Sequence, residues 1–201
     1  MSAIALNRPL VGRFVPDAGV ARLAALVALA VLGTIVLWIS AKLKVPFLPV
    51  PVTLQTLAVP MIAAVYGLRL GLATVLLYFA EAAVGLPVLT NGGGLIQFVG
   101  PTAGYLLGFV VVTIAVGWFA DRYGTHRVAP LFAVMLGANV ILFTLGFAWL
   151  AWGMPLPDGS SGIGTAKAFA GGVAPFVVYD LVKVALAVCA VVGVTRLFRR
   201  N

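Results

Sequence analysis

Two ionisable residues of opposite charge, Asp180 and Lys183, lie three positions apart in an otherwise apolar stretch near the C-terminus. At this spacing, two side chains share one face of a helix and can touch. Ionisable residues inside an apolar span are costly to bury and mark candidate functional sites. Two interpretations stay open. The pair neutralises itself or fastens its helix to a neighbour, or it offers an acceptor and donors to a neutral polar group such as an amide or a urea.

Uncharged polar residues in apolar surroundings form a second set of candidates. Asn91 precedes three glycines, which either let the backbone approach a ligand closely or form a flexible turn. Gln55 and Gln97 lie next to expected loops, where binding roles fit. Asn139 lies inside an apolar block, and we expect it to hydrogen-bond between helices.

Residues for other chemistries are missing. The single cysteine, Cys189, lies in an apolar block and the single histidine, His126, in a basic one, so neither a metal-ligand set nor a Ser/His/Asp set can be assembled. The phosphate-binding G-x-x-x-x-G-K-[ST] motif is also absent. The sequence therefore predicts no metal, no cofactor and no enzymatic activity, and any ATP hydrolysis is expected in a separate chain.

The composition places these candidates in a membrane. Hydrophobic residues make up 63% and charged residues 9% of the 201 positions, against about half and about a quarter in soluble domains. So few charges cannot solvate a water-facing surface. The net charge of +8 comes from basic residues between apolar blocks, which favours membrane topology over nucleic-acid binding. The predicted fold class is an all-α integral membrane protein with one domain, residues 1–201, in contact with membrane lipid.

Six apolar segments are predicted to cross the bilayer, which takes about 20 residues per helix. A mixed segment of about residues 1–20 precedes them and is not a cleavable signal, because it carries charges before any apolar run. A separate short helix or a re-entrant piece stays open for the start of the last segment, which Pro175 interrupts. The predicted spans are about 23–41, 54–67, 70–85, 102–120, 129–151 and 169–198.

The basic residues orient the spans, since cytoplasmic loops carry an excess of lysine and arginine. With the N-terminus inside, the only basic residues in the outer segments are Lys42, Lys44 and Lys167. Both termini are therefore expected in the cytoplasm. A Pro-rich loop, the Gly-rich segment 90–100 and the loop 158–165 then gather on the outer face. The inner segments hold Arg8, Arg13, Arg22, Arg69, Arg122, Arg127, Arg196, Arg199 and Arg200.

Four strings, in order along nearly the whole chain from about residue 23, resemble the BioY family, the biotin-specific S components of energy-coupling factor transporters. They are Val50-Pro-Val-Thr53-Leu-Gln55, Gly85-Leu-Pro87-Val, Gly100-Pro101-Thr102-Ala-Gly104-Tyr105-Leu-Leu-Gly108-Phe and Asp180-Leu-Val-Lys183. The resemblance implies a six-helix fold that binds biotin near the outer face beneath a lid, the first loop. One departure is Leu89, where the family pattern has an aromatic residue, so no ring-stacking contact is assigned there.

The resemblance also implies the site residues. The family's aspartate and lysine match Asp180 and Lys183, which are expected to hydrogen-bond polar groups of biotin. The lid is expected to include Phe47, Leu48 and Pro49. The candidate substrate-binding residues are Asp180, Lys183, Asn91, Gly93, Gln97, Gln55, Tyr105 and Tyr179.

Partners follow from the same resemblance. A transmembrane T component and two ABC-type ATPases are expected to drive release into the cytoplasm across the inner (plasma) membrane, and a homo-oligomer stays open. The partner-contact motif A-x-x-x-A matches Ala21/Ala25 or Ala24/Ala28, with the register open. The alternative function is a proton-coupled or solo secondary transporter of a small vitamin-like solute, with Asp180 or Glu81 as the proton carrier.

Overall fold

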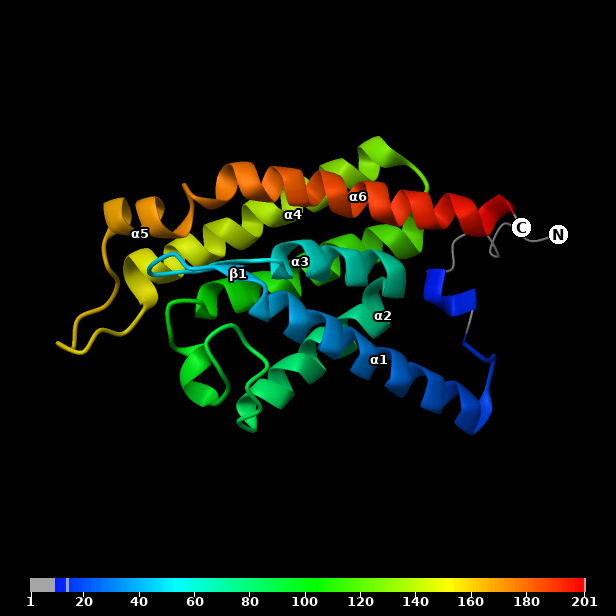
Figure 1. Ribbon diagram of the computed structural model, residues 1–201, viewed down its shortest axis with the longest axis horizontal. Coiled ribbons are helices and arrows are strands. Elements are labelled where there is room, and N and C mark those ends of the chain that lie inside the picture. Colours follow the sequence, from blue (N-terminus) through cyan, green and yellow to red (C-terminus); the bar gives the residue numbers. More distant parts are fainter. Residues whose placement is uncertain (1–9, 14, 201) are drawn as a thin grey trace.

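The computed structural model describes residues 10–13 and 15–200, so Arg8 in the expected cytoplasmic segment lies outside the described residues. In the described part, five helices are long and apolar enough to cross a membrane, and they run roughly along the long axis of the molecule (Figure 1). The five are α1 (Gly19–Lys42), α2 (Gln55–Ala83), α3 (Ala103–Tyr123), α4 (Val128–Ala148), which a π-helical turn η4 (Trp149–Gly153) continues, and α6 (Phe176–Arg200).

Shorter elements connect the long helices. A 3₁₀ helix, η2 (Leu10–Arg13), precedes α1, and the antiparallel strands β1 (Lys44–Val45) and β2 (Val52–Thr53) form a hairpin after it. A second 3₁₀ helix, η3 (Leu95–Phe98), lies between α2 and α3, and the short helix α5 (Thr165–Gly172) precedes α6.

Helix α2 reverses direction within its length. The predicted spans 54–67 and 70–85 form one helical element, in which Gly67 has a non-helical backbone with φ 77° and ψ −178°. A Cβ placed on Gly71 would lie 3.3 Å from the Cα of Ala63, whereas residues eight apart in a continuous helix are separated by about 12 Å. The two halves of α2 therefore pack against each other as an antiparallel pair joined at Gly67, with no loop between them.

The reversal in α2 is held by α3. A Cβ on Gly117 would lie 2.7 Å from the Cα of Leu68, so only a glycine lets α3 approach this corner. The break leaves the N–H of Leu68 without a partner in its own helix, and a carboxylate oxygen of Asp121 accepts that hydrogen bond at 3.0 Å. The sharp turn is thus specified jointly by its own glycine and by the neighbouring helix.

The predicted last span, 169–198, is wrong as a single helix. Residues 165–172 form α5, and α6 begins at Phe176. Pro175 precedes α6 directly, where its missing N–H costs nothing to the new helix but prevents α5 from continuing. Of the two forms left open for its start, the separate short helix is the one observed.

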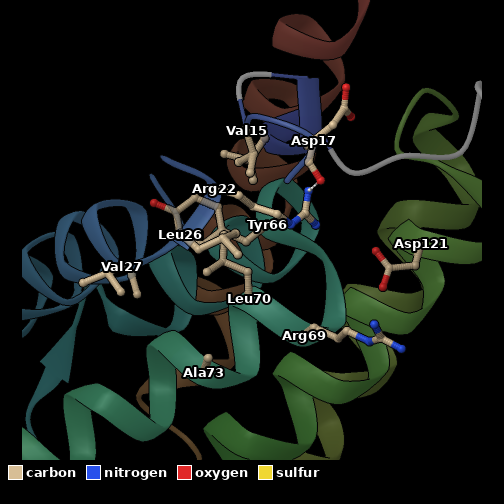
Figure 2. A pocket seen from close by; sticks show the side chains of 13 residues that line it. Val15, Asp17, Arg22, Leu26, Val27, Tyr66, Arg69, Leu70, Ala73 and Asp121 are labelled. Atoms are coloured by element: carbon tan, nitrogen blue, oxygen red, sulfur yellow. Dashed lines mark hydrogen bonds between the residues drawn. The ribbon is translucent and has the colours of Figure 1, made fainter. Parts of the chain in front are cut away.

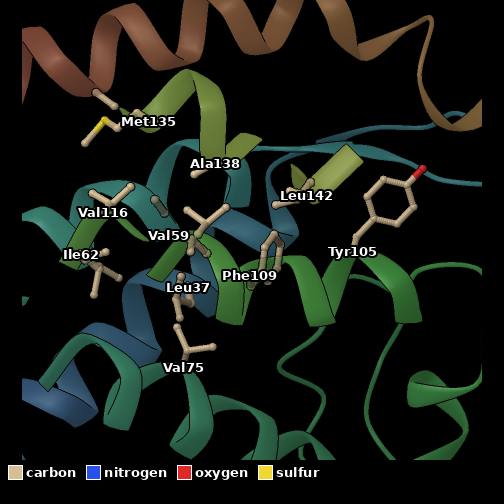
Figure 3. Close-up of a cluster of buried hydrophobic side chains, with 14 of the residues drawn as sticks. Leu37, Val59, Ile62, Val75, Tyr105, Phe109, Val116, Met135, Ala138 and Leu142 are labelled. Carbon is tan, nitrogen blue, oxygen red and sulfur yellow. The ribbon is translucent and has the colours of Figure 1, made fainter. Parts of the chain in front are cut away.

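The core is formed by all the long helices together. Figure 3 shows Leu37 of α1, Val59 and Val75 from the two halves of α2, Val116 of α3 and Met135 of α4 converging on one cluster. Glycines on α3, such as Gly104 and Gly108, allow a close approach to α4. Close packing matters in a membrane because lipid gives helices no hydrophobic driving force to associate. The apolar side chains on the outer surfaces of α1 and α6 suit contact with acyl chains.

Three irregular segments gather at one end of the bundle, on the left of Figure 1: the β1–β2 hairpin, the Gly-rich segment after α2 and the loop before α5. The Nζ of Lys42 donates to the carbonyl of Leu89 at 2.8 Å, and the Nζ of Lys44 donates to the carbonyl of Thr90 at 3.0 Å. These bonds join the base of the hairpin to the Gly-rich segment. The start of α1 and the end of α6 lie at the opposite end (Figure 1).

Candidate functional site

Asp180 and Lys183 are buried and touch each other, as their spacing predicted. The Nζ of Lys183 lies 3.1 Å from Oδ1 of Asp180. Lys183 is 8% exposed and Asp180 is 4% exposed. The ammonium also donates to the carbonyl of Thr53 at 2.7 Å and to the hydroxyl of Thr56 at 3.1 Å. Since an ammonium has three donors, this network uses all of them.

The network fastens α6 to the start of α2. The hydroxyl of Thr56 donates to Oδ1 of Asp180, so this oxygen accepts from two groups. Oδ2 of Asp180 has no hydrogen-bond partner among the described residues. The pair is therefore an ion pair within α6 that hydrogen bonds join to the start of α2, and its second carboxylate oxygen is buried without a partner among the described residues.

A small cavity, the hairpin cavity, lies beneath the β1–β2 hairpin and the Gly-rich segment. Gln55, Asn91, Gln97 and Tyr105, all predicted site residues, line it together with residues that sequence reasoning missed. Its volume is about 40 Å³, far below the roughly 300–1,000 Å³ of pockets that hold drug-sized ligands. The hairpin and the Gly-rich segment thus leave little free volume between them and the helices. The missed lining residues include Val50, Pro51, Thr53, Thr56, Thr90 and Phe143.

Two of the predicted residues are already hydrogen-bonded within the wall of the hairpin cavity. The amide nitrogen of Gln55 donates to the hydroxyl of Tyr78 at 3.0 Å, and its oxygen accepts from the hydroxyl of Thr90 at 3.0 Å. The hydroxyl of Tyr105 donates to the carbonyl of Gly172 at 2.7 Å and so ties α3 to α5. These side chains shape the cavity through the elements they join.

Several predicted site residues line neither this cavity nor the ion pair. Tyr179 is 53% exposed on the outer surface of α6. A Cβ on Gly93 would collide with the backbone of Leu86, so this glycine is needed for loop packing. In the predicted lid, Leu48 is 92% exposed and Phe47 37% exposed, while Pro49 packs against Gly171 of α5.

A second, larger cavity lies between α4, α5 and α6. Its volume is about 420 Å³. The residues that line it are apolar except for Asn139, Thr144 and Asp180. The expectation that Asn139 hydrogen-bonds between helices is wrong, because within the described structure neither atom of its side-chain amide has a partner although the residue is only 3% exposed. Phe143 lines both this cavity and the hairpin cavity.

A third cavity, of about 940 Å³, lies near the other end of the bundle between the N-terminal segment, α1 and α2. Figure 2 shows Asp17 and Arg22 close together at its edge, where a guanidinium nitrogen of Arg22 lies 3.4 Å from the backbone oxygen of Asp17. Arg69 and Asp121 lie on the neighbouring helices. Acidic and basic groups are balanced here, and none of the predicted substrate-binding residues lines it.

Long apolar helices that enclose buried ionisable residues define this molecule as a polytopic membrane protein with a functional site inside its helical bundle. The amino-acid sequence narrows this class to one family. The chain belongs to the BioY family, whose family model matches residues 15–200.

Named relatives and a solved structure agree with this membership. The chain is 37% identical to "Biotin transporter BioY" of Rhizobium etli over 149 residues, which cover 70% of this chain and 75% of that protein. It is 40% identical to the protein of the same name from Rhodobacter capsulatus over 153 residues, covering 70% and 78%. The fold matches the crystal structure of "the S-component for biotin from an ECF-type ABC transporter" with a TM-score of 0.75 and 22% identity, covering 90% of this chain and 95% of that one.

Proposed function

We propose that this protein is a biotin uptake protein, an S component that captures biotin at the outer face and delivers it to the cytoplasm with an ATP-driven energy-coupling factor module. The observation that carries the proposal is the buried Asp180–Lys183 pair, whose hydrogen-bond partner Thr56 lines the hairpin cavity. The names of the curated relatives supply the substrate class.

The chemistry of the site suits biotin. Its ureido group has two N–H donors and one carbonyl acceptor, and it carries no charge. A buried carboxylate such as that of Asp180 accepts a hydrogen bond from such a donor strongly, because the acceptor is ionised and shielded from water. The apolar side chains around the pair accommodate the bicycle and the aliphatic tail.

The proposal includes a location and a topology. The protein lies in the inner (plasma) membrane, crosses it six times and has both termini in the cytoplasm. The antiparallel halves of α2 supply two of the crossings. The arginine-rich end then faces the cytoplasm and the irregular segments face outward. In this orientation the β1–β2 hairpin is the lid, and biotin enters when the hairpin and the Gly-rich segment move apart.

The partner surface is proposed on α1, facing a T component that works with two ABC-type ATPases. Ala24 and Ala28 are both exposed on α1, whereas Ala25, of the alternative pair with Ala21, is half-buried. Two exposed small residues four positions apart allow the close approach of a second helix. We therefore favour the Ala24/Ala28 register, and we assign the contact to the T component in preference to a second copy of this chain.

The direct test is calorimetric titration of the detergent-solubilised protein with biotin. We expect saturable binding that is lost or strongly weakened in Asp180→Asn, while Asp158→Asn, which changes an exposed aspartate in the loop before α5, leaves it intact. Absence of biotin binding by the unmodified protein would overturn the proposal. Uptake that a protonophore abolishes and that needs no ATPases would instead support the proton-coupled alternative.

A further inference from the structure

We propose that the third cavity, between the N-terminal segment, α1 and α2, binds an anionic phospholipid from the membrane leaflet at the arginine-rich end of the bundle. Arg22 and Arg69 hold its phosphate, and the apolar residues beside them hold an acyl chain. The volume of about 940 Å³ lies within the roughly 300–1,000 Å³ of small-molecule pockets. This lipid site is separate from the hairpin cavity, and it does not depend on the proposed transport of biotin.

The wall of the third cavity has a charged side and an apolar side. In Figure 2 the guanidinium groups of Arg22 and Arg69 lie on the same side as Asp121, whereas Val27 and Ala73 lie on the opposite side. Val27 is 55% exposed, so the apolar side is open to the bilayer. An amphiphilic ligand matches both sides, whereas a free phosphate would leave the apolar side without a partner.

The two sides also lie at different depths along the helices. On α1, Arg22 is in the first turn and Ala30 lies about 12 Å further along the helix axis. On α2, Arg69 follows the reversal at Gly67, and Ala73 lies about one turn beyond Arg69. The charged side is therefore at the end of the bundle and the apolar side extends into the span, as do the head and the acyl chain of a phospholipid.

The carboxylates at this cavity are directed elsewhere. Oδ2 of Asp121 accepts the N–H of Leu68 at 3.0 Å, and Oδ1 of Asp121 is buried. The carboxylate of Asp17 points away from the guanidinium of Arg22, which donates to the backbone oxygen of Asp17 instead (Figure 2). The same nitrogen of Arg22 donates to the carbonyl of Pro16 at 3.0 Å. Since a guanidinium has five N–H donors, Arg22 can hold these carbonyls and a phosphate together.

The described residues at this end of the bundle include more arginines than aspartates. They are Arg22, Arg69, Arg122, Arg127 and Arg196, against Asp17 and Asp121. Anionic lipid is attracted by all the basic groups near the membrane surface, whether or not they touch it. A zwitterionic head has no net charge for this field to attract. The excess of arginine therefore favours an anionic phospholipid.

The lipid site and the proposed partner surface lie on opposite faces of α1. Residues two positions apart on a helix point about 200° apart, so Leu26 in the cavity wall faces away from Ala24 and Ala28. A bound lipid thus leaves the partner surface uncovered. The site can be filled both in the free chain and in a complex formed through α1.

The first test is native mass spectrometry of the detergent-purified protein titrated with phosphatidylglycerol. We expect the unmodified protein to bind one lipid saturably. Arg69→Gln should weaken this binding about tenfold, because it removes a charged donor to the phosphate. Arg127→Gln removes the same charge from an exposed position at the same end but outside the cavity, and it should retain the lipid. Equal retention by the two variants would overturn the proposal.

A second pair of variants tests the apolar side of the cavity. Ala73→Trp fills this side from an exposed position of α2, and Ala185→Trp places the same side chain on the exposed surface of α6. We expect Ala73→Trp to weaken the binding of phosphatidylglycerol and Ala185→Trp to leave it unchanged. Melting temperatures without added lipid show whether each variant keeps its fold.

Competing ligands identify the occupant. Phosphatidylcholine should bind more weakly than phosphatidylglycerol, and inorganic phosphate should not displace the bound lipid. Three results would each overturn the proposal. Phosphatidylcholine binds as well as phosphatidylglycerol, inorganic phosphate displaces the lipid while Ala73→Trp has no effect, or Arg69→Gln changes the proportion of dimer instead of the retention of lipid. The last result would assign the cavity to a second copy of the chain.

Discussion

Gln55 and Tyr78 hydrogen-bond through their side chains at 3.0 Å although they lie 23 residues apart in the same helical element. In a continuous helix they would be about 34 Å apart, so the bond records the reversal of α2 at Gly67. The hydroxyl of Tyr78 in turn donates to the carbonyl of Val88 at 2.7 Å, and Gln55 accepts from Thr90. One buried amide thus joins both halves of α2 to the Gly-rich segment over the site.

The corner of α2 is expected to depend on Gly117. Gly117→Val should destabilise the protein by about 1–3 kcal/mol, because its side chain must displace the backbone of Leu68. Thermal unfolding in detergent measures this. Gly137→Ala is the matched control, since its Cβ meets nothing within 4 Å, and it should be neutral or slightly stabilising. Equal melting temperatures for the two variants would contradict the role given to this contact.

The effects of substituting Asp180 and Lys183 on stability are expected to be strongly non-additive, because the two buried charges compensate each other. Lys183→Met leaves a buried carboxylate uncompensated and should cost about 3–5 kcal/mol of stability. The double variant Asp180→Leu with Lys183→Met should recover most of that loss, because an apolar pair of similar volume needs no partner. Biotin binding should remain absent in the double variant. Recovery of binding together with stability would show that the pair serves only to join α6 to α2.

The packing of the Gly-rich segment against the end of α1 is expected to depend on Lys42. Lys42→Met removes the hydrogen bond to the carbonyl of Leu89, which at a partly exposed position contributes about 0.5–1.5 kcal/mol. Biotin should therefore dissociate about two- to tenfold faster, as measured by displacement kinetics. Lys167→Met, which removes the same charge from the exposed surface of α5, is the control. Identical release rates in both variants would argue against the hairpin as a lid.

The proposed partner surface on α1 predicts a separation between binding and transport. Ala24→Leu and Ala28→Leu place bulk on an exposed face, so biotin binding and melting temperature should change little. Co-purification with ATPases and energised uptake should be lost, because a second helix can no longer approach closely. Ala185→Leu makes the same change at an exposed position of α6. If the Ala185→Leu variant also failed to co-purify with the ATPases, the partner contact could not be assigned to α1.

Hydropathy determined much of this architecture. The spans near 23–41, 102–120 and 129–151 match α1, α3 and α4 because apolar length alone specifies a membrane helix. The reversal at Gly67 was predicted only as a short gap between two spans. Its geometry depends on Gly117 and Asp121, which lie about 50 residues away, and no local pattern contains that contact.

The sequence by itself determined the membrane class, the family resemblance and the contact between Asp180 and Lys183, since i,i+3 spacing on a helix fixes that geometry locally. The tertiary structure alone decided which atoms remain free. It gave all three donors of Lys183 to protein acceptors, and it left Oδ2 of Asp180 and the side-chain amide of Asn139 buried without a hydrogen-bond partner among the described residues. Hydrogen-bond satisfaction depends on neighbours from distant helices, so it follows only from packing.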